Sequence, residues 1–298
     1  MKYNLLGKSS LKISEIGFGC MSLGNDEKEN VLILQKAVES GINFFDTADI
    51  YTNGRNEITV GKAVKHTREN VIIATKAGNI IREDGKGLDW NASKKHILSA
   101  AEQSLKRLQT DYIDLYQLHG GTIEDPIDET IEAFETLRKQ GKIRFYGISS
   151  IRPNVIREYI KRSSIVSVMM QYSLLDRRPE ETCFSLLLDN GIGVLARGGL
   201  SKGLLAGKTP ASFINYNEEQ VAEAGAAVSE ISEASREPAQ TALKFVLKAK
   251  PVSSAIVGIR TNEQLQQAVS ASDAPELSNE EYEKLKSVLA RDLYSQHR

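Results

Sequence analysis

Polar side chains follow several short apolar runs of the sequence, at the point where each run ends. Asp46 closes one run, and Tyr51 comes five residues later in a polar turn. If these runs are parallel strands, their carboxyl ends meet at one edge of a sheet, where α/β enzymes hold their chemistry. Further runs are followed in the same way by Lys76, His119, Ser149, Gln171, Arg197 and Arg260.

Each of these residues alone has an ordinary structural explanation. A lysine at a strand end extends its charge to solvent, a histidine is often a satisfied core residue, and an aspartate often caps a turn. Six of them around one opening are better explained as a preorganised site of charges and hydrogen-bond donors.

The residue types in this group favour proton transfer. Lys76 beside Tyr51 is expected to lower the pKa of the phenol from its reference value of about 10, and Asp46 is expected to hold the lysine charged and in place. His119, as a neutral group, is expected to orient a carbonyl oxygen near the hydroxyl of Tyr51. Because no good nucleophile except Lys76 accompanies them, the group indicates proton transfer coupled to a hydride that a cofactor supplies.

Eight strand-like runs alternate with amphipathic helical patterns along the chain. They are residues 15–20, 43–46, 71–76, 112–118, 142–148, 165–170, 192–196 and 253–257. The alternation predicts one (β/α)8 TIM barrel domain over residues 1–298, and fits an open doubly wound sheet less well. Residues 2–14 alternate polar and apolar around a turn at 7–10, which predicts an N-terminal β-hairpin acting as a lid or plug.

The helical patterns carry start signals. Asp125 followed by Pro126 predicts an N-cap with proline at the first helical position, and Ser278 with Glu281 has the spacing of a capping box. Other helices are expected at 29–40 and 57–65, from Ser93, Pro153, Pro179 and Thr261, and as extra elements late in the chain at 218–235 and 238–249.

The composition is typical of a globular protein with a sizeable core. The 298 residues are 41% hydrophobic and 26% charged. With 38 basic and 39 acidic residues, the net charge of −1 provides no electrostatic footprint for nucleic acid or an anionic membrane. Without a signal peptide or an apolar run of about 20 residues, a cytoplasmic location and a small-molecule partner are expected. Two distant cysteines and histidines without ligand spacing predict no metal site.

The motifs at the strand ends resemble those of the aldo-keto reductase family, and the resemblance covers the chain from end to end. The matching segments are 45–48 with Tyr51 and Glu57, 75–76, 115–119, 141–144, 147–149, 171–173, and 258–260 with 263–265. The resemblance implies a catalytic tetrad of Asp46, Tyr51, Lys76 and His119. Tyr51 would give a proton to the carbonyl oxygen of an aldehyde or ketone, while NADPH gives a hydride to the carbon.

The same resemblance implies a site for NADPH/NADP+. Ser149 and Gln171 would hold the nicotinamide carboxamide, the loop 200–202 would cover the pyrophosphate, and Arg260 with Gln264 would grip the adenosine end. A guanidinium suits a 2′-phosphate, so NADPH is expected over NADH. The full expected set is Gly19, Met21, Asp46, Ser149, Ser150, Gln171, Arg197, Leu200, Lys202, Gly258, Arg260 and Gln264.

Three positions depart from the family's commonest pattern. Ser150 stands where Asn is usual, Arg197 where an aromatic residue often stacks on the nicotinamide, and Ala268 where Asn often meets adenine. The loop 203–217 is short, which indicates a reduced belt over the cofactor. The loop 78–92, which contains Trp90, is expected to line the substrate pocket.

Other functions fit some of the same residues. The fold also serves as a cofactor-binding regulatory subunit with vestigial catalysis, as in potassium-channel β subunits. A Schiff-base aldolase would use Lys76, but Asp46 would keep the amine protonated. The segment 203–209 resembles a phosphate-binding P-loop but is one residue short and precedes Pro210, so ATP binding is not expected.

Overall fold

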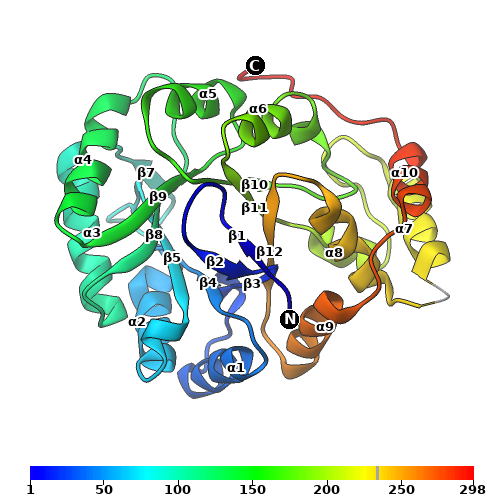
Figure 1. Ribbon diagram of the computed structural model, residues 1–298, viewed down its shortest axis with the longest axis horizontal. Coiled ribbons are helices and arrows are strands. Elements are labelled where there is room, and N and C mark those ends of the chain that lie inside the picture. The colour runs from blue at the N-terminus through cyan, green and yellow to red at the C-terminus, as the bar shows by residue number, and fades with distance from the viewer. Residues whose placement is uncertain (233–234) are drawn as a thin grey trace.

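Eight parallel strands close into a barrel surrounded by helices, as the alternating pattern predicts (Figure 1). The computed structural model describes residues 1–232 and 235–298. In chain order, the barrel strands are β3 (Ile16–Gly19), β4 (Phe44–Asp46), β5 (Ile72–Ala77), β8 (Ile113–Leu118), β9 (Ile143–Ser149), β10 (Ser167–Gln171), β11 (Gly193–Arg197) and β12 (Val252–Gly258). The prediction of a (β/α)8 barrel is confirmed.

Ten α-helices lie in the described part of the chain. They are α1 (Glu27–Glu39), α2 (Arg55–Val64), α3 (Lys94–Leu108), α4 (Ile127–Lys139), α5 (Pro153–Arg162), α6 (Cys183–Asp189), α7 (Glu218–Ser232), α8 (Pro238–Lys248), α9 (Asn262–Asp273) and α10 (Asn279–Val288). The predicted capping box of Ser278 and Glu281 at the start of α10 is confirmed. None of these helices is both long and apolar enough to cross a membrane.

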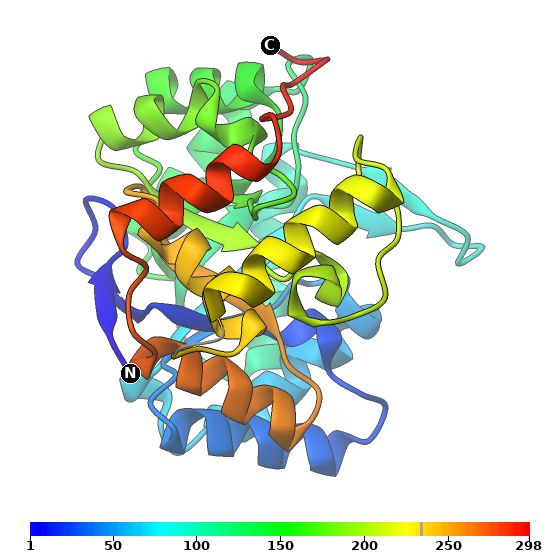
Figure 2. The same ribbon diagram turned by 90° about the vertical axis from the view of Figure 1, so that its right-hand side faces the viewer.

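The late extra helices are confirmed in part. Figure 2 shows α7 and α10 along one side of the molecule, and Lys284 of α10 pairs with Glu230 of α7 at 2.7 Å between Nζ and Oε1. The helix expected at 218–235 ends at Ser232, and residues 233–234 of that prediction lie outside the described residues.

Two predicted helix starts are wrong. Helix α4 begins at Ile127, and Asp125 does not cap it because its carboxylate accepts hydrogen bonds from Trp90 Nε1 and Thr122 N, at 2.8 and 2.7 Å. Near Pro179 the chain makes only a 3₁₀ turn, Arg178–Glu180. Helix α6 starts at Cys183, because Thr182 has a non-helical φ of −146°.

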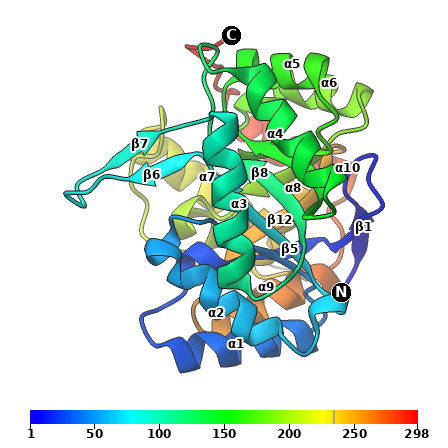
Figure 3. The ribbon, with the colours of Figure 1, turned by 90° about the vertical axis from the view of Figure 1, so that its left-hand side faces the viewer.

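The N-terminal hairpin plugs one end of the barrel. Strands β1 (Tyr3–Leu5) and β2 (Lys12–Ser14) pair antiparallel, as predicted. Leu6, Leu11 and Ile13 are fully buried and pack with side chains that fill the barrel interior, including those of Phe44, Leu115 and Leu195. Figure 1 shows the hairpin lying across the centre of the barrel, and Figure 3 shows β1 at one end of the molecule.

A second hairpin projects from the opposite end. Strands β6 (Asn79–Ile81) and β7 (Leu88–Trp90) pair antiparallel within the loop after β5, and Figure 3 shows them extending away from the barrel. Because β6 follows the carboxyl end of β5, this end of the barrel also carries the polar residues that follow the strands. The first hairpin therefore closes the end without these residues and leaves the other end open for a site.

Candidate active site

The expected ion pair between Asp46 and Lys76 is present at the strand ends. Asp46 is the last residue of β4 and Lys76 the next to last of β5. The Nζ of Lys76 lies 2.7 Å from Asp46 Oδ2 and also donates a hydrogen bond of 2.7 Å to Thr47 O. The lysine side chain is only 1% exposed, so both interactions act away from water and hold its ammonium group in one place.

The loop after β4 carries Tyr51 over this pair. Thr47 N donates to Ala74 O and Asp49 N donates to Lys76 O, at 2.9 and 3.1 Å, so the loop follows the carboxyl end of β5. Tyr51 then begins a 3₁₀ turn. Its ring centroid lies 5.2 Å from Lys76 Nζ. Asp46 at the end of β4 and Tyr51 in the loop after β4 are therefore both next to the ammonium group of Lys76.

A buried network fixes the base of the loop. Glu57, at the start of α2, is fully buried. Its carboxylate accepts hydrogen bonds of 2.6 Å from both Thr75 Oγ1 and Arg107 Nε. Thr75 precedes Lys76 on β5, so the same strand anchors both α2 and the ammonium group beneath Tyr51.

His119 completes the group from the neighbouring strand. It follows β8, and its ring packs edge-on against Tyr51 with 5.9 Å between centroids. Burial, with the charges of Lys76 and Arg197, lowers the pKa of His119 to about 3. The imidazole is therefore neutral near pH 7, as expected, and can form a hydrogen bond without carrying charge.

The expectation that the pKa of Tyr51 lies below its reference value is wrong, although Lys76 acts in the expected direction. Burial raises the pKa of the phenol above its ordinary value, and the nearby ammonium offsets only part of that effect. Burial also disfavours the charge of Lys76, but the negative charge and the hydrogen bond of Asp46 outweigh it, so the pKa of the lysine is raised. The group therefore consists of an ammonium, a neutral imidazole and a protonated phenol, which can donate a proton.

A cavity of about 690 Å³ opens beside Tyr51, Lys76 and His119. Trp90 forms one wall, as expected for the loop 78–92. Its indole N–H is held by Asp125, and its ring lies so close to Gly78 and Gly120 that a Cβ atom there would come within 2.7 and 3.2 Å of it. The wall is therefore fixed by packing on two glycines as well as by a hydrogen bond.

A second cavity, of about 310 Å³, adjoins the first. Both are lined by Met21, Tyr51, Met169 and Arg197, so they meet at the phenol. Several of the residues expected to contact a cofactor line the second cavity, namely Gly19, Met21, Asp46, Gln171, Arg197, Lys202 and Gly258. Pairing of Gly258 with Gly19 and of Gly19 with Asp46 places the ends of three strands side by side along it.

The remaining expected cofactor residues lie elsewhere. Ser149 and Ser150 line the first cavity, whereas Leu200, Arg260 and Gln264 line neither. Arg260 Nε donates to the carbonyl oxygen of Ser22, a residue of the second cavity, at 2.9 Å. The side-chain oxygen of Gln264 accepts from Arg260 N at 2.8 Å and from Thr261 N, the N-cap residue of α9, at 3.3 Å. These two residues therefore lie at the outer end of the second cavity.

Some lining residues were not anticipated from the sequence. Arg152 and Thr122 line the first cavity, and Phe213 lines the second. Arg152 lies three residues after the motif at 147–149 and could have been proposed from that position. Phe213 lies in the loop 203–217, where its aromatic side chain was the only signal.

The comparisons with known proteins agree with this geometry. The model of the aldo/keto reductase family matches residues 15–290. The uncharacterized oxidoreductase YqkF of Bacillus subtilis is 48% identical, with all of both chains covered. The holo form of the aldo-keto reductase AKR11C1 from Bacillus halodurans superimposes with a TM-score of 0.94 at 48% identity, covering 100% of this chain and 99% of that one.

A more distant solved structure has the same fold. It is the glycerol dehydrogenase AKR11B4 from Gluconobacter oxydans, with a TM-score of 0.87 at 25% identity over 96% of this chain and 94% of that chain. The family match spans nearly the whole barrel, including every strand end described above. The chain therefore belongs to the aldo/keto reductase family, and it is an oxidoreductase with the (β/α)8 fold.

Proposed function

We propose that the protein is an NADPH-dependent reductase of aldehydes or ketones in which Tyr51 donates the proton. The observation that carries the proposal is the position of Tyr51, which lines both cavities and lies beside the buried ammonium of Lys76. A group at this junction can reach a carbonyl in one cavity while a cofactor occupies the other.

The roles of the side chains follow from their charges. Tyr51 protonates the carbonyl oxygen, and Lys76 stabilises the phenolate that remains, because opposite charges attract strongly in a buried site. Asp46 keeps the ammonium charged and aimed, through the contact of 2.7 Å. Neutral His119 orients the carbonyl oxygen by a hydrogen bond. A reduced nicotinamide, when bound, supplies the hydride.

The second cavity suits a dinucleotide. Lys202 and Arg197 supply positive charge for phosphates, and Gly19 and Gly258 line the cavity at two strand ends without adding a side chain. Ser201 and Lys202 both have positive φ, +48° and +60°, a strained conformation that often occurs where a loop clamps a ligand. Arg260 at the outer end suits the 2′-phosphate of NADPH. The holo form of the Bacillus halodurans relative also supports a bound cofactor.

Replacing Tyr51 with Phe tests the mechanism. We expect NADPH oxidation with a panel of aldehydes and ketones to fall by a factor of about 100 or more, because general-acid catalysis is lost. NADPH affinity, measured by fluorescence titration in parallel with NADH, should change little. Undiminished turnover in Tyr51→Phe would sink the proposal. NADPH binding without turnover of any carbonyl by the unaltered protein would instead favour a regulatory cofactor-binding role.

A further inference from the structure

The first cavity is lined by three cationic side chains and by no aspartate or glutamate of the described residues. They are Lys76, Arg152 and Arg197. The charge of Lys76 is balanced by Asp46 at 2.7 Å. Neither arginine has a carboxylate partner within residues 1–232 and 235–298: Arg152 donates to Gly121 O, and Arg197 donates to Gln171 Oε1. The cavity therefore has an excess of positive charge.

Arg152 is the cation specific to this cavity. Arg197 lines both cavities, whereas Arg152 lines only the first. Its Nη1 donates to the carbonyl of Gly121 at 2.5 Å, which fixes the guanidinium and leaves its other N–H groups available. Asp125, near Gly121, directs its carboxylate to Trp90 and Thr122 instead.

The location of Arg152 strengthens its attraction for anions. It is the N-cap residue of α5, a helix of 10 residues, and the N-terminal end of a helix carries partial positive charge. The cavity wall beside it is mostly apolar, with Leu88, Trp90 and Ile151 among the lining residues. An apolar wall next to an uncompensated guanidinium fits a ligand with an apolar body and an anionic end.

We infer that the preferred substrates are carbonyl compounds with an apolar body and a carboxylate remote from the carbonyl, and that Arg152 binds the carboxylate. The inference rests on the proposed reductase function and goes beyond it by naming the substrate class. The fork of a guanidinium matches the two oxygens of a carboxylate, which makes Arg152 a residue for substrate choice rather than for chemistry.

A matched pair of substrates tests this inference. 4-Carboxybenzaldehyde and methyl 4-formylbenzoate have similar shape but differ by one negative charge, and because the ester group withdraws more electrons than the carboxylate, the acid is the intrinsically less reactive aldehyde. The unaltered protein should have a higher kcat/KM for the acid. In Arg152→Gln, kcat/KM for the acid should fall by about 10- to 100-fold, mainly through KM, because a charge-assisted hydrogen bond is lost. The value for the ester should be unchanged, and Arg152→Lys should restore part of the preference.

The control is Arg157→Gln, which removes an exposed arginine from the same helix. It should leave both substrates unaffected. Equal kcat/KM for acid and ester in the unaltered protein would overturn the substrate class while leaving the reductase function intact. An equal loss for both substrates in Arg152→Gln would show a purely structural role and overturn the assignment. Absence of turnover with every carbonyl would overturn the proposed function, and this inference with it.

Discussion

Asp49 is a half-buried residue between Asp46 and Tyr51, the two residues that bracket the site loop. Burial, followed by repulsion from Glu57, raises its pKa from 3.8 to about 7. One of its oxygens is buried without a hydrogen-bond partner among the described residues. Asp49 is therefore a residue whose ionisation the folded state disfavours, and unlike Asp46, which pairs with Lys76, it forms no ion pair within the described residues.

This raised pKa predicts a pH-dependent gain of stability for Asp49→Asn. Below pH 3.8 the carboxyl is protonated in both folded and unfolded states and has no electrostatic cost. As pH rises from 3.8 to 7 only the unfolded state ionises readily, so the free energy of unfolding falls, and above pH 7 the full cost is present. The advantage of the variant should therefore grow by roughly 2 kcal/mol between pH 5 and pH 8.

Urea unfolding of both proteins at the two pH values measures this difference. The slope of the unfolding free energy against urea should be the same for each protein, which confirms that the folded states match. A stability difference that does not change with pH would contradict the raised pKa of Asp49.

Among the elements, the two hairpins have different roles at opposite ends of the barrel: β1–β2 closes one end, and β6–β7 extends from the end that carries the site (Figure 3). The β1–β2 hairpin fills the closed end with Leu6, Leu11 and Ile13. Its turn at Gly7 has a φ of +53°, and a Cβ atom there would lie 2.5 Å from Gly193 N and 2.6 Å from Val166 O. The plug thus depends on close approach of one backbone to another.

Gly7→Ala should therefore destabilise the protein far more than the backbone conformation alone requires. A non-glycine residue with positive φ costs about 1–2 kcal/mol. At Gly7 the new methyl group would also clash with the barrel backbone and displace the β1–β2 hairpin, so we expect the free energy of unfolding to fall by about 3 kcal/mol or more. Thermal or urea unfolding measures it.

Gly85→Ala is the matched control. Gly85 lies in the turn of the β6–β7 hairpin with a φ of +69°, but no atom of the described residues lies within 4 Å of a Cβ atom there. Gly85→Ala introduces the same backbone strain without the clash, so the free energy of unfolding should fall by only about 1–2 kcal/mol. Equal losses for the two variants would mean that the turn at Gly7 can move away from the barrel.

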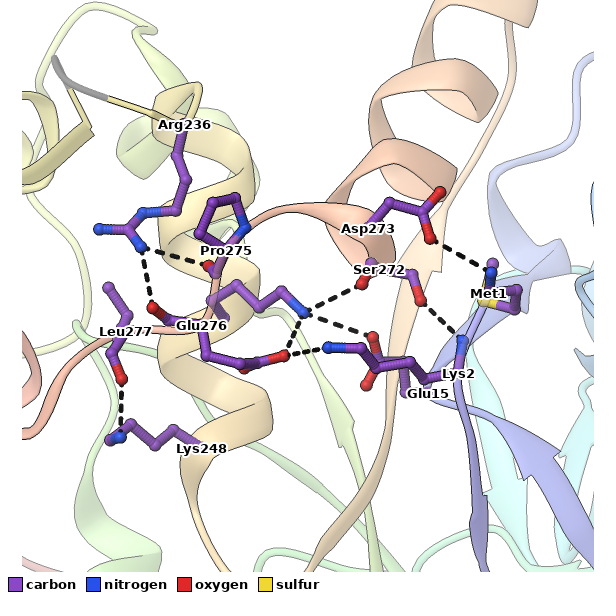
Figure 4. Close-up of polar contacts among 11 residues, drawn as sticks. Met1, Lys2, Glu15, Arg236, Lys248, Ser272, Asp273, Pro275, Glu276 and Leu277 are labelled. Carbon is purple, nitrogen blue, oxygen red and sulfur yellow. Dashed lines mark hydrogen bonds and ion pairs between the residues drawn. The ribbon is translucent and has the colours of Figure 1, made fainter.

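Across the whole molecule, a network of charges joins the N-terminus to the late helices (Figure 4). Lys244 of α8 is fully buried, and its Nζ donates to Glu276 Oε1 and Ser272 O at 2.8 and 3.2 Å. It also pairs with buried Glu15 at 3.5 Å. From the other side, the α-amino group of Met1 pairs with Asp273 at 3.3 Å. Residues before β3 are therefore held to α8 and to the end of α9 and the segment just after it.

Lys244→Met tests the contribution of this network. The substitution leaves Glu15 buried without its partner, so the free energy of unfolding should fall by about 3–5 kcal/mol. Adding Glu15→Gln removes the uncompensated charge and should recover a large part of the loss. Urea unfolding of the single and double variants measures both effects.

Lys284→Met serves as the comparison, because its pair with Glu230 is about half exposed on both sides. Exposed pairs contribute little, so the loss should stay below about 1 kcal/mol. If Lys244→Met were equally mild, solvent would have to reach Glu15, contrary to its burial.

The sequence alone determined the barrel and the positions of its chemistry. The spacing of hydrophobic residues distinguishes strands from helices within short segments, so eight strand–helix units could be counted. Asp46, Lys76 and His119 could then be assigned to strand ends. Capping at Ser278 was equally predictable, since it depends on residues three apart. These features are encoded within short segments, and each agrees with the global fold.

Only the tertiary structure decided what depends on burial or on distant partners. The pKa of Tyr51 is raised because the loss of water around the phenol outweighs the attraction of Lys76, a balance that no local pattern contains. The carboxylate of Asp125 does not cap α4, because it accepts a hydrogen bond from Trp90, which lies 35 positions away in the sequence. Arg152 lines the first cavity rather than the outer surface because Gly121, on a different loop, holds its guanidinium there.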